Sequence, residues 1–107
     1  MRTEDKKKTL HGAVVTRILE GDGVASRVQR RGAFDNAGLA EPLSTLVNKV
    51  AKQPSRVTDE DVAAVKASCL SEDQIFDLVV CAAVGQASRQ YETALTALAE
   101  AMSDHAS

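Results

Sequence analysis

Two cysteines and the charged residues near one of them are the side chains in this sequence best suited to do chemistry. If the segment around Cys81 is helical, Asp77 stacks one turn before it, and Arg89 lies about two turns after it. A reactive cysteine needs a nearby cation or a helix N-terminus, and Arg89 is the only basic residue near Cys81, although it lies on a different face of the helix. We therefore take Cys81, Asp77 and Arg89 as the candidate catalytic residues.

A structural role for the cysteines competes with this interpretation and is favoured by their surroundings. Carboxylates and apolar neighbours raise the pKa of a thiol, whereas a reactive cysteine needs a cation or a helix N-terminus. Cys69 is better placed, just before a helix start, but we expect the loop to leave it partly buried. Asp77 lies within an apolar segment and must find a partner there.

The sequence does not predict a disulfide, a metal site or a cofactor. On a helix that starts after Ser71, Cys81 is roughly 15 Å from the cap, whereas a disulfide needs Cα atoms within about 7 Å. The cysteines lack metal-ligand spacing, and His11 and His105 lie near opposite ends of the chain. We expect no metal, zinc included, and no cofactor.

The elements that must position these side chains are helices with clear starts. Thr58 and Ser71 can each cap a first turn, and Asp61 and Gln74 can reach back to the cap residue's own N–H. The second cap begins a long helix over 72–102, whose single glycine, Gly85, weakens a helix without ending it. Its first half is apolar almost all round, which is typical of burial on several sides. Its second half carries one apolar stripe, formed by Val84, Ala87, Tyr91, Ala94, Leu95, Leu98 and Met102.

The rest of the chain is also predicted to be helical. A short helix is predicted from Thr9, because Leu10, Val14 and Ile18 would lie on one of its faces. Another helix is predicted to begin at Pro42, because the residues after it form an apolar stripe. No segment shows the alternation of apolar and polar residues that is typical of a β-strand. We therefore predict an all-α bundle of about five helices in one domain (9–107), preceded by a mobile tail (1–8). The remaining expected segments are a helix over 24–33, a connection over 34–39, and helices over 42–53 and 58–67. The helix over 24–33 carries the basic cluster Arg27, Arg30 and Arg31, which could hold a phosphate, although a solvated face is the favoured interpretation.

The charge balance and the lengths of the apolar runs indicate which classes of binding partner to expect. The 13 Lys and Arg residues against 15 Asp and Glu give a slightly acidic chain, which is unlike a nucleic-acid binder. The apolar run after Ile75 is too short for a membrane span. The first residues lack the apolar region of a signal peptide. We expect no nucleic-acid or membrane partner and a cytoplasmic location.

The two capped helices and the long Ala/Val helix together resemble the carboxymuconolactone decarboxylase and AhpD-like (alkylhydroperoxidase) superfamily, over about the last two-thirds of the chain from Glu41. The resemblance implies an all-helical fold and homo-oligomers (dimers, trimers or hexamers) that assemble through the long helices. It also implies, for the redox branch, a Glu-x-x-Cys-x-x-Cys-x-x-x-His relay on the helix before the first capped one.

That relay is missing here. With Glu41 in the first place, Ser44, Val47 and Ala51 stand where the two cysteines and the histidine belong, and residues 40–56 contain neither residue type. Cys69 is a second departure, because such segments usually have glycine there. A cysteine at that point implies either a different turn or a strained left-handed residue.

Three hypotheses follow. The first is a non-redox helical oligomer that binds a small molecule or a partner. The second is an active enzyme, of the decarboxylase or one-cysteine peroxidase type, that uses an intersubunit pocket near Cys81. The third is a structural or regulatory interaction module. A cavity containing Asp77, Cys81 or Arg89 favours the enzyme, and a filled, dry interface favours the others.

Overall fold

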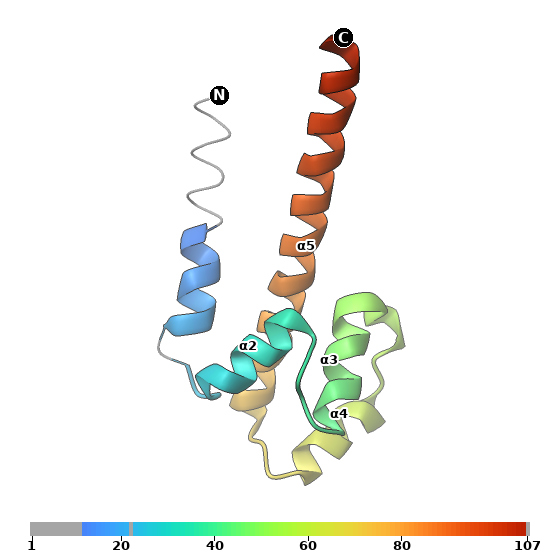
Figure 1. Cartoon of the computed structure of the whole chain (residues 1–107). Helices are drawn as coiled ribbons and strands as arrows, with labels where there is room; N and C mark the ends of the chain where they lie inside the picture. Colours follow the sequence, from blue (N-terminus) through green and yellow to red (C-terminus); the bar gives the residue numbers. More distant parts are fainter. Residues whose placement is uncertain (1–11, 22, 107) are drawn as a thin grey trace.

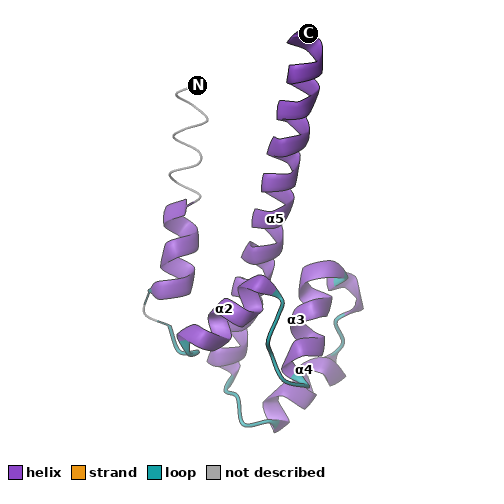
Figure 2. Ribbon diagram, viewed as in Figure 1, coloured by secondary structure: helices purple, strands orange, loops and turns teal. Residues whose placement is uncertain are grey.

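The computed structural model describes residues 12–21 and 23–106, and this part of the chain is helical without any strand. Residues 12–20 form a first helical segment, and a 3-10 turn, η1 (Pro54–Arg56), separates two of the later helices. The four remaining helices are α2 (Arg27–Asp35), α3 (Leu43–Lys52), α4 (Asp59–Ala67) and α5 (Glu72–Ala106). The predicted all-α fold of about five helices with a long C-terminal helix is confirmed (Figures 1 and 2).

Helix α5 is the axis of the fold. Helices α2, α3 and α4 pack around its N-terminal half, while its C-terminal half extends beyond them (Figure 1). No helix in the described ranges is long and apolar enough to cross a membrane. The buried core lies where α3 and α5 meet, and Leu46, Val47, Val65 and Leu78 are each at most 1% exposed. The predicted stripe of α3 therefore faces the core as expected.

Both predicted helix starts have the expected hydrogen bonds. The Asp61 N–H donates to Thr58 Oγ1 (3.2 Å), and the Thr58 N–H donates to Asp61 Oδ2 (2.9 Å). At α5 the Gln74 N–H donates to Ser71 Oγ (3.1 Å), and the Ser71 N–H donates to Gln74 Oε1 (2.8 Å). These reciprocal bonds satisfy N–H groups that a helix leaves free, so the two starts are fixed locally.

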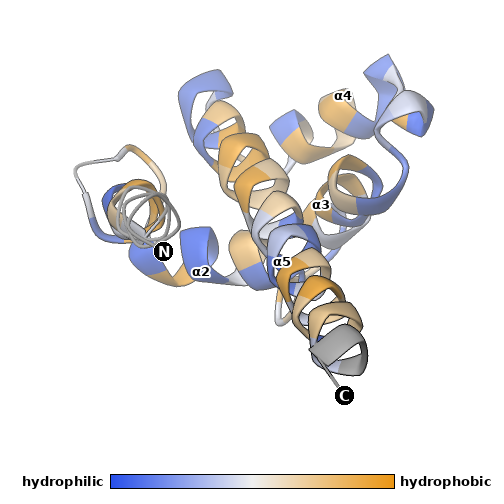
Figure 3. Ribbon diagram, turned by 90° about the horizontal axis from the view of Figure 1, so that it is seen from above, coloured by the Kyte–Doolittle hydropathy of each residue, from blue (hydrophilic) through white to orange (hydrophobic). Residues whose placement is uncertain are grey.

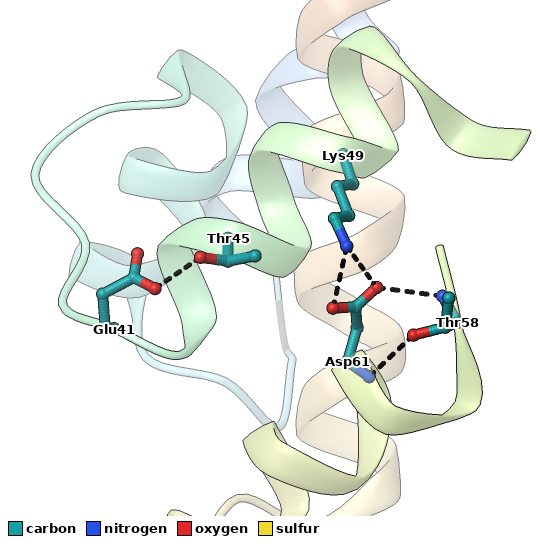
Figure 4. Close-up of polar contacts among 5 residues, drawn as sticks. All are labelled: Glu41, Thr45, Lys49, Thr58 and Asp61. Atoms are coloured by element: carbon teal, nitrogen blue, oxygen red, sulfur yellow. Dashed lines mark hydrogen bonds and ion pairs between the residues drawn. The ribbon is translucent and has the colours of Figure 1, made fainter. Parts of the chain in front are cut away.

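The reciprocal hydrogen bonds between Thr58 and Asp61, at the start of α4, also connect α4 to α3. The Lys49 ammonium group contacts both carboxylate oxygens of Asp61, at 3.0 and 2.9 Å (Figure 4). The ammonium group and the Thr58 N–H together lower the pKa of Asp61. Glu41 and Thr45 make a second bond, at the start of α3. The cap that the sequence predicts thus also sets the position of α4 against α3.

Gly85 does not end or interrupt α5, and its role is close packing. A Cβ at this position would collide with the carbonyl group of Phe34, in the last turn of α2. Glycine therefore lets the backbone of α2 lie directly against α5. The Arg89 guanidinium, one turn further, donates to the same Phe34 oxygen at 2.6 Å. Together Gly85 and Arg89 hold the end of α2 on α5.

The N-terminal half of the fold departs from the sequence prediction at several points. Residues 1–8 and Leu10 lie outside the described residues, Val14 is 50% exposed, and Leu19 is buried instead. The predicted helix over 24–33 begins later, after the N-cap Ser26, and runs into the expected 34–39 connection as far as Asp35. Asn36, with φ 52°, ends it in left-handed geometry. The helix boundary shifted because Ser26 accepts a bond from the Gln29 N–H, a cap the prediction did not use.

The apolar half of α5 is buried on fewer sides than predicted. Ile75, Leu78 and Ala82 are buried, but Phe76 on the other side is 68% exposed. Helices α2, α3 and α4, which contact α5, leave this side of it uncovered in a single chain. Apolar residues nevertheless recur along the coloured part of α5 (Figure 3).

Candidate functional site

Two of the three candidate catalytic residues share a cavity. Asp77 and Cys81 line an open pocket of about 200 Å³ between the N-terminal helical segment, α2 and α5. Arg89 does not reach it, since its guanidinium group bonds to Phe34 O and, at 2.9 Å, to Gln86 Oε1. Arg89 therefore lies outside this pocket, two turns along α5 from Cys81 and at the end of α2. The full lining is Arg17, Ile18, Gly23, Arg30, Phe76, Asp77, Val80 and Cys81.

The hydrogen-bond partners of Asp77 are backbone N–H groups in the segment just before α2. Its Oδ2 atom accepts hydrogen bonds from the N–H groups of Val24 (2.6 Å) and Ala25 (3.1 Å). These residues are more than fifty positions away in sequence, so the contact joins the N-terminal part of the chain to α5. A carboxylate held by two N–H donors is a positioning group first. It also gives the pocket a negative charge at a fixed place.

Arg30 is a pocket residue that the sequence prediction did not place in the candidate site. It was assigned to a solvated face with Arg27 and Arg31, yet it is only 5% exposed, while the other two are exposed. Arg30 Nη1 donates to the carbonyl oxygens of Ile18 (3.1 Å) and Gly21 (2.7 Å). Its Nε is buried and has no hydrogen-bond partner. Its spacing of three residues from the buried Ala33 was the signal that could have placed it inward.

Gly23 allows the two charged groups of the pocket to approach one another. A Cβ at this position would lie 3.1 Å from Arg30 Nη1 and 3.2 Å from Asp77 Oδ2. These distances are tighter than ordinary van der Waals contact, so a larger residue would displace one of the two side chains. The guanidinium and the carboxylate therefore both lie close to this one glycine.

Cys81 is a buried, neutral thiol. It is 1% exposed, and its Sγ lies 4.0 Å from the carbonyl oxygen of Ile18. Burial raises the pKa of Cys81, Asp77 raises it further, and only the Arg30 charge acts in the opposite direction. Because burial is the largest of these effects, the thiol form is favoured over the thiolate. The expectation that Asp77 disfavours ionisation is in line with this, but the neighbouring cation is Arg30 and not Arg89.

Cys69 has the left-handed geometry that the sequence left open. Its φ is 74°, in the turn between α4 and α5. The predicted partial burial is wrong, since Cys69 is exposed. The reason is that Ser68 and Cys69 lie in a turn that leads away from the core, whereas Leu70 turns back toward it.

The two thiols should differ sharply in reactivity. In a Cys69→Ser variant, Cys81 should react with iodoacetamide at neutral pH at least about tenfold more slowly than Cys69 does in a Cys81→Ala variant. Burial blocks the reagent, and the raised pKa of Cys81 keeps the thiolate scarce. Rates would be measured by mass spectrometry across pH, and unfolding in urea should make the two variants equally reactive. Fast labelling of folded Cys81 at pH 6 would contradict the neutral-thiol assignment.

The arrangement can bind a ligand more readily than it can catalyse a reaction. Two guanidinium groups and one carboxylate give the pocket wall a net positive charge, and Ile18, Phe76 and Val80 supply apolar surface. The thiol is neutral, and the carboxylate is engaged by N–H donors. Over the described residues, no group of three or more His, Cys, Asp or Glu side chains could hold a metal ion.

Comparisons with known proteins give no match. No family model matches the chain, and neither a curated protein nor a solved structure matches it.

Proposed function

We propose that this chain is a small-molecule-binding subunit of a helical homo-oligomer of the carboxymuconolactone decarboxylase and AhpD-like kind, without the redox dithiol. The observation that carries the proposal is the cavity into which buried Arg30, Asp77 and exposed Arg17 converge. The helix that would hold the redox relay supports the non-redox part. Val47 and Ala51, in two of the relay positions, are 0% and 7% exposed and belong to the core.

The lining indicates the class of ligand. The positive charges outnumber the negative one, and the hydrogen bonds among the described residues use only Nη1 of Arg30. An anionic group suits this wall, because charge-assisted bonds to guanidinium groups are the stronger ones. The apolar side chains of Phe76 and Val80 could pack against an aromatic or aliphatic part of the ligand. The ligand is therefore a small organic anion with an apolar part.

Benzoate and the uncharged benzamide form a matched pair of probes for this proposal. Amide chemical shifts of the pocket residues should change saturably with benzoate, in roughly the millimolar range expected of so small a ligand, and much less with benzamide. Arg17→Gln should weaken benzoate binding about tenfold through loss of a charge-assisted contact. Arg27→Gln is the control, because Arg27 is exposed on α2 and lies outside the pocket. Equal binding of both probes, or of neither, would overturn the proposal.

The assembly part of the proposal is supported by the apolar side chains that α5 leaves exposed. Phe76, Leu98 and Met102 are 68%, 51% and 63% exposed. Large apolar side chains that recur on one helix mark interaction surfaces. Static light scattering at micromolar concentration should give at least twice the 11.4 kDa chain mass.

An enzyme is the second candidate, and the cavity that holds both Asp77 and Cys81 is the observation that favours it. Thiol chemistry there would require a thiolate, which the burial of Cys81 opposes. Hydroperoxide turnover that Cys81→Ala abolishes would move this candidate into first place. A protein that assembles but binds neither probe would instead fit an interaction module.

A further inference from the structure

A second pocket lies beside the one that contains Arg30 and Asp77, and the two pockets share Phe76. It has a volume of about 270 Å³ and lies between α4 and the first turns of α5, with a mostly apolar surface. The residues that line it are Val62, Lys66, Glu72, Ile75, Phe76 and Val79. We call it the apolar pocket, and the one with Arg17, Arg30 and Asp77 the charged pocket.

The two pockets differ in the charge that they offer to a ligand. In the apolar pocket, Lys66 Nζ donates to Glu72 Oε1 at 2.5 Å. This hydrogen bond lowers the pKa of Glu72, so at neutral pH both charges are present and cancel one another. In the charged pocket, two guanidinium groups accompany one carboxylate, and that carboxylate already accepts bonds from two N–H groups. The charged pocket therefore suits an anion, and the apolar pocket suits a hydrocarbon.

Helix geometry places the two pockets on adjacent sides of α5. Helices α2 and α4, which form their other walls, lie on different sides of α5 (Figures 1 and 3). At about 100° per residue, Val79 in the apolar pocket and Val80 in the charged pocket point in different directions, and Phe76 lies between them. Leu78 and Ala82, on the far side of the helix, are 0% exposed and close the way through the core. The open path between the pockets therefore crosses Phe76.

The length of this path follows from the size of a helix. The centres of the two linings on α5 are separated by about a third of a turn round the helix axis. With a diameter of about 10–12 Å including side chains, a third of the circumference is roughly 10–12 Å. An extended hydrocarbon chain, with C–C bonds of about 1.5 Å that each advance it by about 1.3 Å, covers this path with about eight to ten bonds. Phe76 is 68% exposed, so such a chain would bury apolar surface along the way.

We infer that the ligand is a linear aliphatic carboxylate of about eight to ten carbons, with its carboxylate in the charged pocket and its tail crossing Phe76 into the apolar pocket. The inference rests on the proposed function and specifies the ligand. Val62 and Val79 contact the end of the tail. A shorter acid, or an aromatic one such as benzoate, occupies the charged pocket alone and therefore binds more weakly.

A series of linear acids tests the length of the ligand. Butanoate, hexanoate, octanoate and decanoate would be titrated and followed by NMR. Affinity should rise about two- to fourfold for each added CH₂ group that is buried, so octanoate should bind at least about tenfold more tightly than butanoate. The methyl chemical shifts of Val62 and Val79 should change saturably with octanoate and not with butanoate. Octanol, the matched probe without the charge, should bind about tenfold more weakly than octanoate. Equal binding of octanol and octanoate would overturn the inference.

Val79→Thr tests whether the tail enters the apolar pocket. Threonine has nearly the shape of valine but places a hydroxyl group in the pocket, so the ratio of octanoate to butanoate affinity should fall about fivefold. A ratio of two ligands on one variant is not changed by a general loss of stability. Val28→Thr is the control, because Val28 is 83% exposed on α2 and lines neither pocket, and its ratio should equal that of the unchanged protein. A ratio in Val79→Thr equal to that of the control would overturn the inference.

The same titrations separate the inference from the proposed function. If benzoate and butanoate bind in the charged pocket but octanoate binds no more tightly, the inference is wrong and the proposed function stands. If benzoate, butanoate and octanoate all fail to bind, both are overturned.

Discussion

Replacing Gly85 with alanine should destabilise the protein by about 2–4 kcal/mol, although alanine is the better helix former by about 1 kcal/mol. The added Cβ would overlap the carbonyl group of Phe34, so the end of α2 must move off α5. That movement would also break the bond from Arg89 to the Phe34 oxygen. The free energy of unfolding, measured by urea denaturation, should fall with little change in far-UV circular dichroism of the native state.

Gly12→Ala is the matched control for this prediction. A Cβ at Gly12 meets nothing within 4 Å, so the same substitution should be neutral or slightly stabilising there. If Gly85→Ala raised stability by about the helix-propensity difference, as at an exposed position, the close contact between α2 and α5 would be refuted.

Asp77→Ala should cost about 2–3 kcal/mol and loosen the N-terminal part of the fold before the rest. The substitution removes the acceptor for the Val24 and Ala25 N–H groups, and it leaves buried Arg30 without the carboxylate beside Gly23. Asp77→Asn keeps one acceptor oxygen, so its cost should be about half. Urea denaturation gives the totals, and amide hydrogen exchange should speed up first at Val24 and Ala25.

Glu92→Ala provides the reference, because Glu92 is exposed on the same helix and a surface substitution there should change stability by at most about 0.5 kcal/mol. A loss in Asp77→Ala no larger than in this variant would mean that the Asp77 bonds contribute little to the fold. Equal losses in Asp77→Ala and Asp77→Asn would point to the charge, and not to the hydrogen bonds, as the source of the effect.

Part of the candidate site could be predicted from the sequence, whereas the position of its arginine residues could not. Asp77 and Cys81 lie one helical turn apart, so their proximity follows from helix geometry alone. Arg30 joins them from a helix about fifty residues earlier, and only the crossing of α2 over α5 brings it there. Arg89 was included as a candidate because it is close to Cys81 in the sequence. In the fold, the crossing of α2 over α5 places Phe34 beside it, and Arg89 donates a hydrogen bond to the Phe34 carbonyl oxygen.

The elements whose causes are local could be predicted from the sequence alone. The starts at Thr58 and Ser71 depend on hydrogen bonds that span three residues, and the stripe of α3 depends on the period of one helix, so each was visible in a short window. The burial of Arg30 and the close packing at Gly85 became visible only in the folded chain. Both depend on how closely two distant helices approach, and that distance is set by the summed packing of the whole core, which no short window of sequence contains.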